Sequence, residues 1–184
     1  MQRKLLILVF VCCSVIVFAQ KSKKKHRHTN DTTTAAANTT PQPDYRVTGA
    51  PMPPVKMVTM AGKKITTQDL QSDVNLLVML FNPTCEHCEE QTEIFKKNIF
   101  LFKNTKLVMM AGPMMLPYLE YFNNNHKVSE YPGTIMLGVD SSSFIEKAFM
   151  YQTLPQINVY DKERKLVRIF NGNVPIDTLK QYIQ

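Results

Sequence analysis

Tryptophan is absent from this sequence of 184 residues, and glycine is scarce, with 6 glycines against 11 prolines. This excludes a collagen-like chain and a glycine-rich low-complexity chain. Charged residues make up only 20% of the chain and hydrophobic residues 44%, which is typical of a globular protein and excludes disorder along the whole chain. A chain of this length usually forms one domain with short extensions, so we expect a single folded domain.

The positive charge of the chain is concentrated near its N-terminus. The formal net charge is +7, yet residues 45–184 contain 15 Lys and Arg against 13 Asp and Glu, which leaves only +2 for the predicted folded part. Proteins that bind nucleic acids usually carry a basic patch on the folded domain itself. The distribution therefore excludes nucleic acid from the expected partners.

The first 19 residues have the parts of a secretory signal peptide. Residues 1–4 are basic, residues 5–18 form an apolar run of 14, and Ala19 supplies a small residue at the cleavage site. This run is shorter than the about 20 residues that a helix needs to cross a bilayer. We therefore expect cleavage before Gln20 and export from the cytoplasm. The alternative is an uncleaved membrane anchor, whose basic C-terminal flank would prefer the cytoplasmic side.

Residues 20–52 are predicted to form a flexible, basic tether rich in Thr, Asn and Pro. Residues 20–44 contain no hydrophobic side chain larger than alanine, and such a segment cannot bury enough apolar area to offset its ordering entropy. The folded domain is predicted over residues 53–184, where regular hydrophobic patterns begin. The sequence thus predicts a leader (1–19), a tether (20–52) and one domain (53–184).

From residue 55 onward, hydrophobic periodicity predicts strands that alternate with helices. The continuous apolar run at residues 76–81 is typical of a strand buried on both faces. The other expected elements are a hairpin at 55–66, a short helix at 67–70, helices at 85–102, 115–125 and 174–183, strands at 106–111 and 134–138, a helix capped by Ser141–Ser143 that ends near residue 150, and a hairpin at 156–170. This order predicts an α/β fold with a central mixed sheet flanked by helices.

Cysteine is too scarce for a disulfide-stapled scaffold, because only Cys85 and Cys88 remain once the leader is removed. A structural disulfide across so small a loop would constrain the unfolded chain little. A zinc site needs four ligands, and no second cysteine pair is present, so we expect no metal. Redox exchange is the interpretation that the pair favours.

The position of the motif supports redox exchange. Cys85 falls at the predicted start of a helix, where unpaired backbone N–H groups and the helix dipole favour the thiolate. Cys88 lies three residues further on the same helical face, close enough to form a disulfide after a small adjustment. Cys85 can therefore attack a substrate disulfide, and Cys88 can resolve the resulting mixed disulfide.

The block LVMLFNPTCEHCEE, followed about 65 residues later by Thr153-Leu154-Pro155, resembles the thioredoxin-like superfamily. The preceding hairpin is similar to the exported TlpA and ResA branch, and the resemblance covers residues 53–184. It implies a thioredoxin-like fold with an extra N-terminal hairpin, an exposed nucleophile at Cys85 and a buried resolving thiol at Cys88. It also implies that Pro155 is a cis-proline facing the disulfide, and that the segment from Thr153 to Pro155 binds an extended substrate peptide.

The sequence departs from that family at two positions. Thr84 stands where an aromatic residue usually precedes the first cysteine, and Met79 stands where many thioredoxins carry a buried acid. Proton transfer to Cys88 must then use another group, such as Glu86 or water. His87 is expected to tune the redox potential, because an imidazolium in the first helical turn would stabilise a thiolate. We expect His126 to be a solvent-exposed helix end.

Together these features predict an extracytoplasmic, most simply periplasmic, thiol–disulfide oxidoreductase without a bound cofactor. Its expected partners are cysteine-containing client proteins and a thiol–disulfide recycling protein, and it is expected to be a monomer. A membrane is a partner only if the N-terminal segment stays uncleaved. The alternative is a redox-silent, thioredoxin-like binding module that holds a partner on the surface around Pro155.

Overall fold

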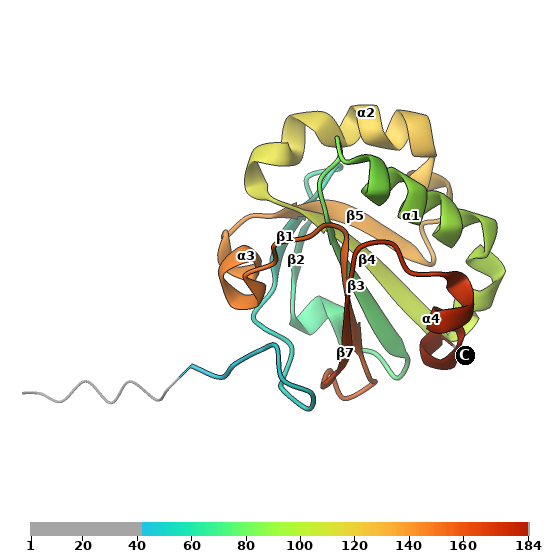
Figure 1. Ribbon diagram of the computed structural model, residues 1–184. Helices are drawn as coiled ribbons and strands as arrows, with labels where there is room; N and C mark the ends of the chain where they lie inside the picture. The colour runs from blue at the N-terminus through green and yellow to red at the C-terminus, as the bar shows by residue number, and fades with distance from the viewer. Residues whose placement is uncertain (1–41, 184) are drawn as a thin grey trace, which may run out of the picture. The chain divides into compact units, whose positions relative to one another are not determined.

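The computed structural model describes residues 42–183, which form a central sheet covered by helices on both faces (Figure 1). The strands are β1 (Lys56–Thr59), β2 (Lys64–Thr66), β3 (Asn75–Phe81), β4 (Thr105–Ala111), β5 (Ile135–Asp140), β6 (Gln156–Tyr160) and β7 (Leu166–Asn171). The helices are α1 (Glu86–Lys97), α2 (Leu116–His126), α3 (Phe144–Phe149) and α4 (Ile176–Ile183). Short 3₁₀ segments are η1 (Gln68–Leu70), η2 (Ile99–Asn104), η3 (Pro113–Met115) and η4 (Val128–Glu130).

The sheet has seven strands in the order β2-β1-β5-β4-β3-β6-β7. The three central strands β5, β4 and β3 are parallel, and β1, β2, β6 and β7 add antiparallel pairs at the two sides. The mixed α/β sheet and the extra N-terminal hairpin β1–β2 are therefore confirmed. The strands β3 and β4 are parallel, and their pairing runs up to Phe81 and Ala111. The segments that follow them therefore leave from the same end of the sheet, at the carboxyl ends of these two strands.

The two faces of the sheet carry separate hydrophobic clusters, because alternate residues of a strand point to opposite sides. Leu77, Met79 and Phe81 of β3 pack in one cluster with buried residues of α1, α2 and α4. Leu76, Val78 and Leu80 pack on the other side with α3 and the N-terminal segment. This burial on both faces confirms the interpretation of the apolar run at residues 76–81.

The helix predicted over residues 85–102 is broken at Asn98, so this expectation was wrong in its length. Asn98 leaves helical geometry with φ −118°, and its side-chain amide donates to the carbonyl oxygen of Ile94 at 2.8 Å. The chain continues as η2 before β4 begins. The break allows Phe102 to turn back and pack edge-to-face on Phe95, with ring centroids 5.6 Å apart.

The predicted serine cap of α3 was also wrong. Ser143 stands at the start of α3 with φ 52° and makes no capping hydrogen bond through its side chain. The carboxylate of Asp140 acts instead, because it accepts hydrogen bonds from the backbone N–H groups of Ser142 and Ile145, both at 2.9 Å. Asp140 ends β5, so a single side chain joins the last residue of a strand to the first turn of the next helix.

The compact part of the chain extends to the N-terminal side of residue 53. Tyr45, Ala50 and Met52 are each only 7% exposed. Backbone hydrogen bonds join Gly49 to Leu166 at 2.7 Å and Met52 to Arg164 at 2.9 Å. The predicted leader and residues 20–41 of the predicted tether lie outside the described residues. Within residues 42–183, no helix has both the length and the apolar character that crossing a membrane requires.

Candidate active site

The turn between β3 and α1 is held by a local network of hydrogen bonds around Asn82. Its side-chain oxygen accepts hydrogen bonds from the backbone N–H of Thr84 at 2.9 Å and from the Thr84 hydroxyl at 3.0 Å. Its carbonyl oxygen accepts a hydrogen bond from the backbone N–H of Cys85 at 3.1 Å. The buried strand β3 therefore fixes the backbone on which the first cysteine stands.

Cys85 is the N-cap residue of α1, with φ −101° and ψ 118°. Its carbonyl oxygen accepts the first hydrogen bonds of the helix, from the backbone N–H groups of Cys88 at 2.9 Å and Glu89 at 3.1 Å. The side chain thus stands at the positive end of the helix dipole, as the sequence predicts. Both thiols of the pair are free in the structure.

The two cysteines differ strongly in exposure. Cys85 is half-buried, whereas Cys88 has no exposed surface and belongs to the hydrophobic cluster beneath α1 and α2. Burial raises the pKa of the Cys88 thiol far above its usual range, and its interaction with Cys85 raises it further. Cys88 is therefore a protonated thiol at neutral pH, while Cys85 is the thiol that solvent can reach.

The loop before β6 brings Leu154 to the exposed sulfur. Cys85 Sγ lies 3.9 Å from the carbonyl oxygen of Leu154, although 69 residues separate the two in sequence. The Leu154–Pro155 peptide bond is cis, Pro155 is buried, and Thr153 is exposed. Antiparallel pairing of β6 with β3 places Gln156 opposite Leu80. The loop before β6 therefore lies at the carboxyl end of β3, where the turn that carries Cys85 begins.

His87 and Glu86 are both exposed on the first turn of α1. The imidazole of His87 is 68% exposed, and its Nδ1 lies 3.1 Å from the carboxylate of Glu90. Glu90 also accepts a hydrogen bond from Asn173 at 2.5 Å, and these contacts lower the pKa of Glu90. The part that His87 and Glu86 take in redox tuning stays a prediction.

His126 is not the exposed helix end that we expected, because its side chain is only 12% exposed. The ring packs on Phe122, with centroids 4.6 Å apart, and lies beside two glutamates of α1. His126 Nδ1 lies 2.8 Å from Glu93, and Nε2 lies 3.8 Å from Glu89. Burial pushes the pKa of Glu93 upward, but hydrogen bonds from Lys96 and His126 outweigh it, so that the pKa is lowered.

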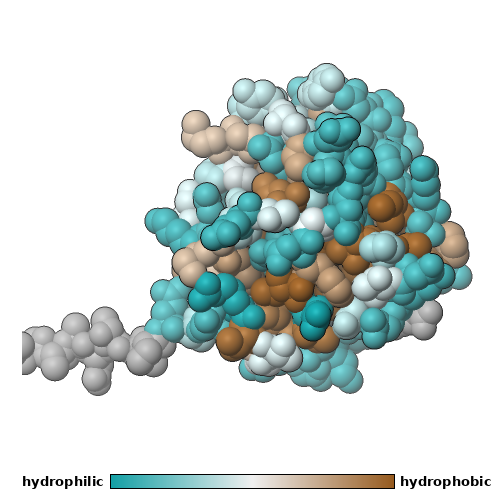
Figure 2. Space-filling view, in the orientation of Figure 1, coloured by the Kyte–Doolittle hydropathy of each residue, from teal (hydrophilic) through white to brown (hydrophobic). Residues whose placement is uncertain are grey.

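Two residue spacings were weak signals for this cluster, and both were missed. Glu89 follows Cys85 by four residues, and Glu93 follows Glu89 by four, so all three lie along one side of α1. Nothing in the local pattern pointed to His126, which comes from a different helix. Figure 2 shows a largely hydrophilic surface over α2 and the adjoining part of α1.

An apolar side chain, Met79, stands where the family resemblance would place a buried acid. Met79 is fully buried among apolar residues. Gln91 is also fully buried, and its amide bonds to both the N–H and the carbonyl of Val174, at 2.6 and 3.3 Å, which ties α1 to the segment before α4. Within residues 42–183, no group of three or more His, Cys, Asp or Glu side chains is arranged to hold a metal ion.

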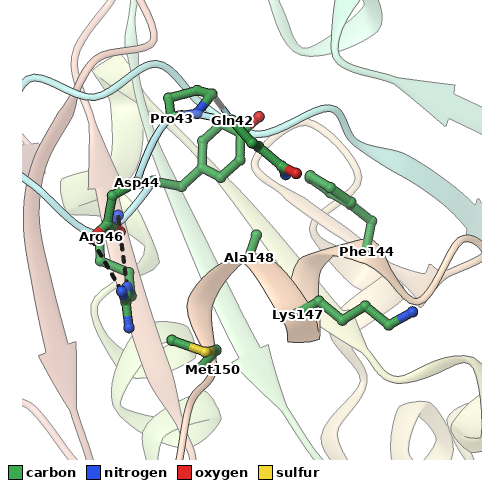
Figure 3. Close-up of a pocket in the computed structure, with 9 residues that line it drawn as sticks. Gln42, Pro43, Asp44, Arg46, Phe144, Lys147, Ala148 and Met150 are labelled. Atoms are coloured by element: carbon green, nitrogen blue, oxygen red, sulfur yellow. Dashed lines mark hydrogen bonds and ion pairs between the residues drawn. The ribbon is translucent and has the colours of Figure 1, made fainter. Parts of the chain in front are cut away.

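A hollow beside the N-terminal segment (residues 42–46) lies apart from these residues. It measures about 500 Å³ and lies between the segment and α3, with Arg46, Phe144 and Met150 among its lining (Figure 3). Arg46 is turned back onto Asp44, with a side-chain contact of 2.8 Å. None of the lining residues belongs to the cysteine site, so the hollow adds nothing to its chemistry.

Comparison with known proteins identifies the fold. No family model and no curated protein sequence matches the chain. Solved structures do match, among them StoA from Bacillus subtilis, which is 16% identical with a TM-score of 0.58 over 74% of this chain and 99% of that one. The chain has the thioredoxin-like fold.

Two further thioredoxin-like structures are similar. The thioredoxin domain of a thiol-disulfide oxidoreductase from Bacteroides vulgatus is 16% identical, with a TM-score of 0.60 over 75% of this chain and 99% of that domain. DsbF from MTB is 15% identical, with a TM-score of 0.58 over 71% of this chain and 91% of that one. The thioredoxin-like fold that the sequence predicts is thus confirmed.

Proposed function

We propose that this protein is a thiol–disulfide oxidoreductase that exchanges disulfides with protein cysteines through the Cys85–Cys88 couple. The observation that carries the proposal is the asymmetry of the pair. An accessible sulfur stands at a helix N-terminus, and a fully buried thiol lies one turn behind it. This arrangement separates an attacking group from a resolving group, as exchange through a mixed disulfide requires.

The exchange proceeds in two steps. The Cys85 thiolate attacks a client disulfide, a Cys85–client disulfide forms, and the client's other sulfur leaves as a thiolate. Cys88 then loses its proton and attacks Cys85, so the second client sulfur is released. The client gains two electrons and two protons, and the protein is left with a Cys85–Cys88 disulfide. The same steps in reverse oxidise a client dithiol.

The Leu154 segment supplies a binding edge for the client. The carbonyl of Leu154 lies beside the Cys85 sulfur and accepts no backbone hydrogen bond among the described residues. An extended peptide can donate a backbone N–H to this carbonyl, which would align its own cysteine with Cys85. We infer that Thr153, Leu154 and Pro155 hold the client in this way.

The cellular setting follows from the N-terminal sequence. The apolar run and Ala19 support export and cleavage before Gln20, which would place the domain outside the cytoplasm. N-terminal sequencing of the protein recovered from the periplasm tests this. A chain that begins at Gln20 in the soluble fraction supports the proposal, whereas an intact chain that begins at Met1 in the membrane fraction contradicts cleavage.

Reduction of insulin by dithiothreitol tests the activity. We expect the protein to accelerate the turbidity that follows reduction, and we expect Cys85→Ser to remove the acceleration completely. Ser141→Ala, a change on the exposed surface away from the cysteines, is the matched control and should be as active as the unchanged protein. Turbidity that is no faster than with dithiothreitol alone would favour the redox-silent binding module.

A further inference from the structure

The Cys85 sulfur and the Leu154 carbonyl are carried by different parts of the fold. Cys85 stands at the start of α1, whereas Leu154 belongs to the loop before β6. The carbonyl of Pro155 accepts a hydrogen bond from the Gly172 N–H at 2.8 Å, so residues 172–174, which follow β7, are bound to that loop. The distance between the sulfur and the Leu154 carbonyl therefore depends in part on how α1 is fixed to residues 172–174.

Gln91 joins α1 to this segment through two hydrogen bonds. Its side-chain oxygen accepts the backbone N–H of Val174 at 2.6 Å, and its side-chain nitrogen donates to the Val174 carbonyl at 3.3 Å. Gln91 has no exposed surface, and Val174 is only 4% exposed. A buried backbone group that loses its partner is costly, so this pairing holds Val174 at one place against α1.

A second link lies on the surface, one residue earlier in each segment. The side-chain amide of Asn173 donates to the Glu90 carboxylate at 2.5 Å. The same carboxylate lies 3.1 Å from Nδ1 of His87, in the first turn of α1. Glu90 and Asn173 are both exposed, in contrast to the buried pair beside them. The two links together fix the second turn of α1 to the segment that follows β7.

We propose that Gln91 is a positioning residue for the client: by holding residues 172–174 against α1, it keeps the Leu154 carbonyl beside the Cys85 sulfur. The inference rests on the proposed function, because it concerns the same binding edge for the client. Gln91 acts through the backbone of Val174, and its hydrogen bonds go to that residue rather than to either sulfur. The contact of Glu90 with Asn173 is the exposed part of the same link.

This placement predicts an effect on client binding rather than on the reactivity of the thiol. A client peptide that donates to the Leu154 carbonyl needs that oxygen at a suitable distance and angle, since a hydrogen bond weakens steeply when its geometry changes. A small disulfide reagent reaches the half-buried Cys85 sulfur without that hydrogen bond. Loss of the Gln91 side chain should therefore weaken client binding and leave the reaction with the small reagent unchanged.

The test compares a protein client with a small reagent. Fluorescein-labelled insulin, whose fluorescence rises on reduction, is used over a range of concentrations with dithiothreitol as the reductant, which gives KM and kcat. An excess of 5,5′-dithiobis(2-nitrobenzoate) measures the reaction of Cys85 through release of the first thionitrobenzoate. Gln91→Leu removes both hydrogen bonds at a similar side-chain volume.

Asn75→Ala is the matched control. Asn75 donates to the carbonyl oxygen of Tyr182 at 2.9 Å, so the control also removes a hydrogen bond from a side chain to the backbone of a distant segment. Asn75 is the first residue of β3, whereas the cysteines follow the last, Phe81. The control therefore removes a tertiary hydrogen bond without altering the link between α1 and residues 172–174.

We expect Gln91→Leu to raise the KM for insulin about three- to tenfold, which is the effect of one weakened hydrogen bond to the client. The turnover number kcat should change less than KM, and the reaction of Cys85 with the small reagent should change less than about twofold, because the lost interaction concerns binding. Asn75→Ala should leave KM, kcat and the reaction with the small reagent unchanged.

The exposed link gives a second measurement that needs no buried substitution. Asn173→Ala should raise the KM for insulin about twofold, as the loss of one exposed hydrogen bond allows. In a Glu90→Ala background the same change should have no further effect, since the two residues share one contact. Both residues are exposed, so these variants should fold even if Gln91→Leu does not. Independent, additive effects of the two changes would contradict the shared link.

An unchanged KM for insulin in Gln91→Leu overturns the inference. Equal slowing with insulin and with the small reagent also overturns it, because the effect would then lie on the Cys85 thiol itself. Failure of the proposed function has a different signature. In that case the unchanged protein would not accelerate insulin reduction at any concentration, although Cys85 would still react with the small reagent.

Discussion

Replacement of Asp140 by alanine should destabilise the domain through the start of α3. Asp140 is only 3% exposed, and its carboxylate accepts three hydrogen bonds, from the Ser142 N–H, the Ser142 hydroxyl and the Ile145 N–H, at 2.9, 2.7 and 2.9 Å. Loss of an N-cap side chain costs about 1 kcal/mol. A buried donor left without a partner costs about 1–3 kcal/mol more, and the Ile145 N–H becomes such a donor.

The free energy of unfolding should therefore fall by about 2–4 kcal/mol in Asp140→Ala. Urea denaturation followed by far-ultraviolet circular dichroism measures the difference. Asp140→Asn keeps one acceptor oxygen and should lose less. Ser143→Ala removes a side chain that makes no capping bond, so it should change stability by less than about 0.5 kcal/mol. Equal losses in Asp140→Ala and Ser143→Ala would refute the assignment of the cap to Asp140.

Three further predictions concern packing, pH and redox tuning. Gly138→Ala should lower the free energy of unfolding by about 1–3 kcal/mol in the same urea assay. The reason is that the added Cβ would lie 2.5 Å from the carbonyl oxygen of Val58 on β1. Unchanged stability would contradict this packing. The lowered pKa of Glu93 means that its contacts stabilise the fold above the ordinary glutamate pKa of 4.5, and that this contribution is lost as the pH falls through the lower folded value. Glu93→Gln should therefore be less stable at pH 7 and lose less on acidification, and parallel acid titration curves would contradict the prediction. His87→Ala should make the cysteine couple more reducing by at most about 30 mV in a glutathione titration. The shift is small because the exposed imidazole is screened by solvent and already paired with Glu90. An unchanged redox potential would leave His87 as a surface residue.

The order of strands and helices was predictable because it depends on local patterns. The run of apolar residues that forms β3 identifies a doubly buried strand without any knowledge of its neighbours. The ends of helices were less predictable, since they depend on which of several polar side chains reaches the free backbone groups. Three serines preceded α3, yet the aspartate at the end of β5 is the residue that caps it.

The candidate site was predictable only in part, for the same reason. The position of Cys85 at a helix start follows from the strand and helix on either side of it. Its contact with the Leu154 carbonyl joins residues that lie 69 positions apart, and only the family resemblance pointed to it. The contact of His126 with Glu93 spans 33 positions and depends on how α2 crosses α1, which no local pattern records.

The most direct test of the account is the trapping of mixed disulfides by the two single-cysteine variants. Each variant is expressed with its natural leader, thiols are blocked with N-ethylmaleimide, and complexes are detected on non-reducing gels. If Cys85 attacks and Cys88 resolves, Cys88→Ser should accumulate client complexes that dissociate on reduction, and Cys85→Ser should accumulate none. Equal trapping by both variants, or trapping by Cys85→Ser alone, would contradict the roles that burial assigns to the two thiols.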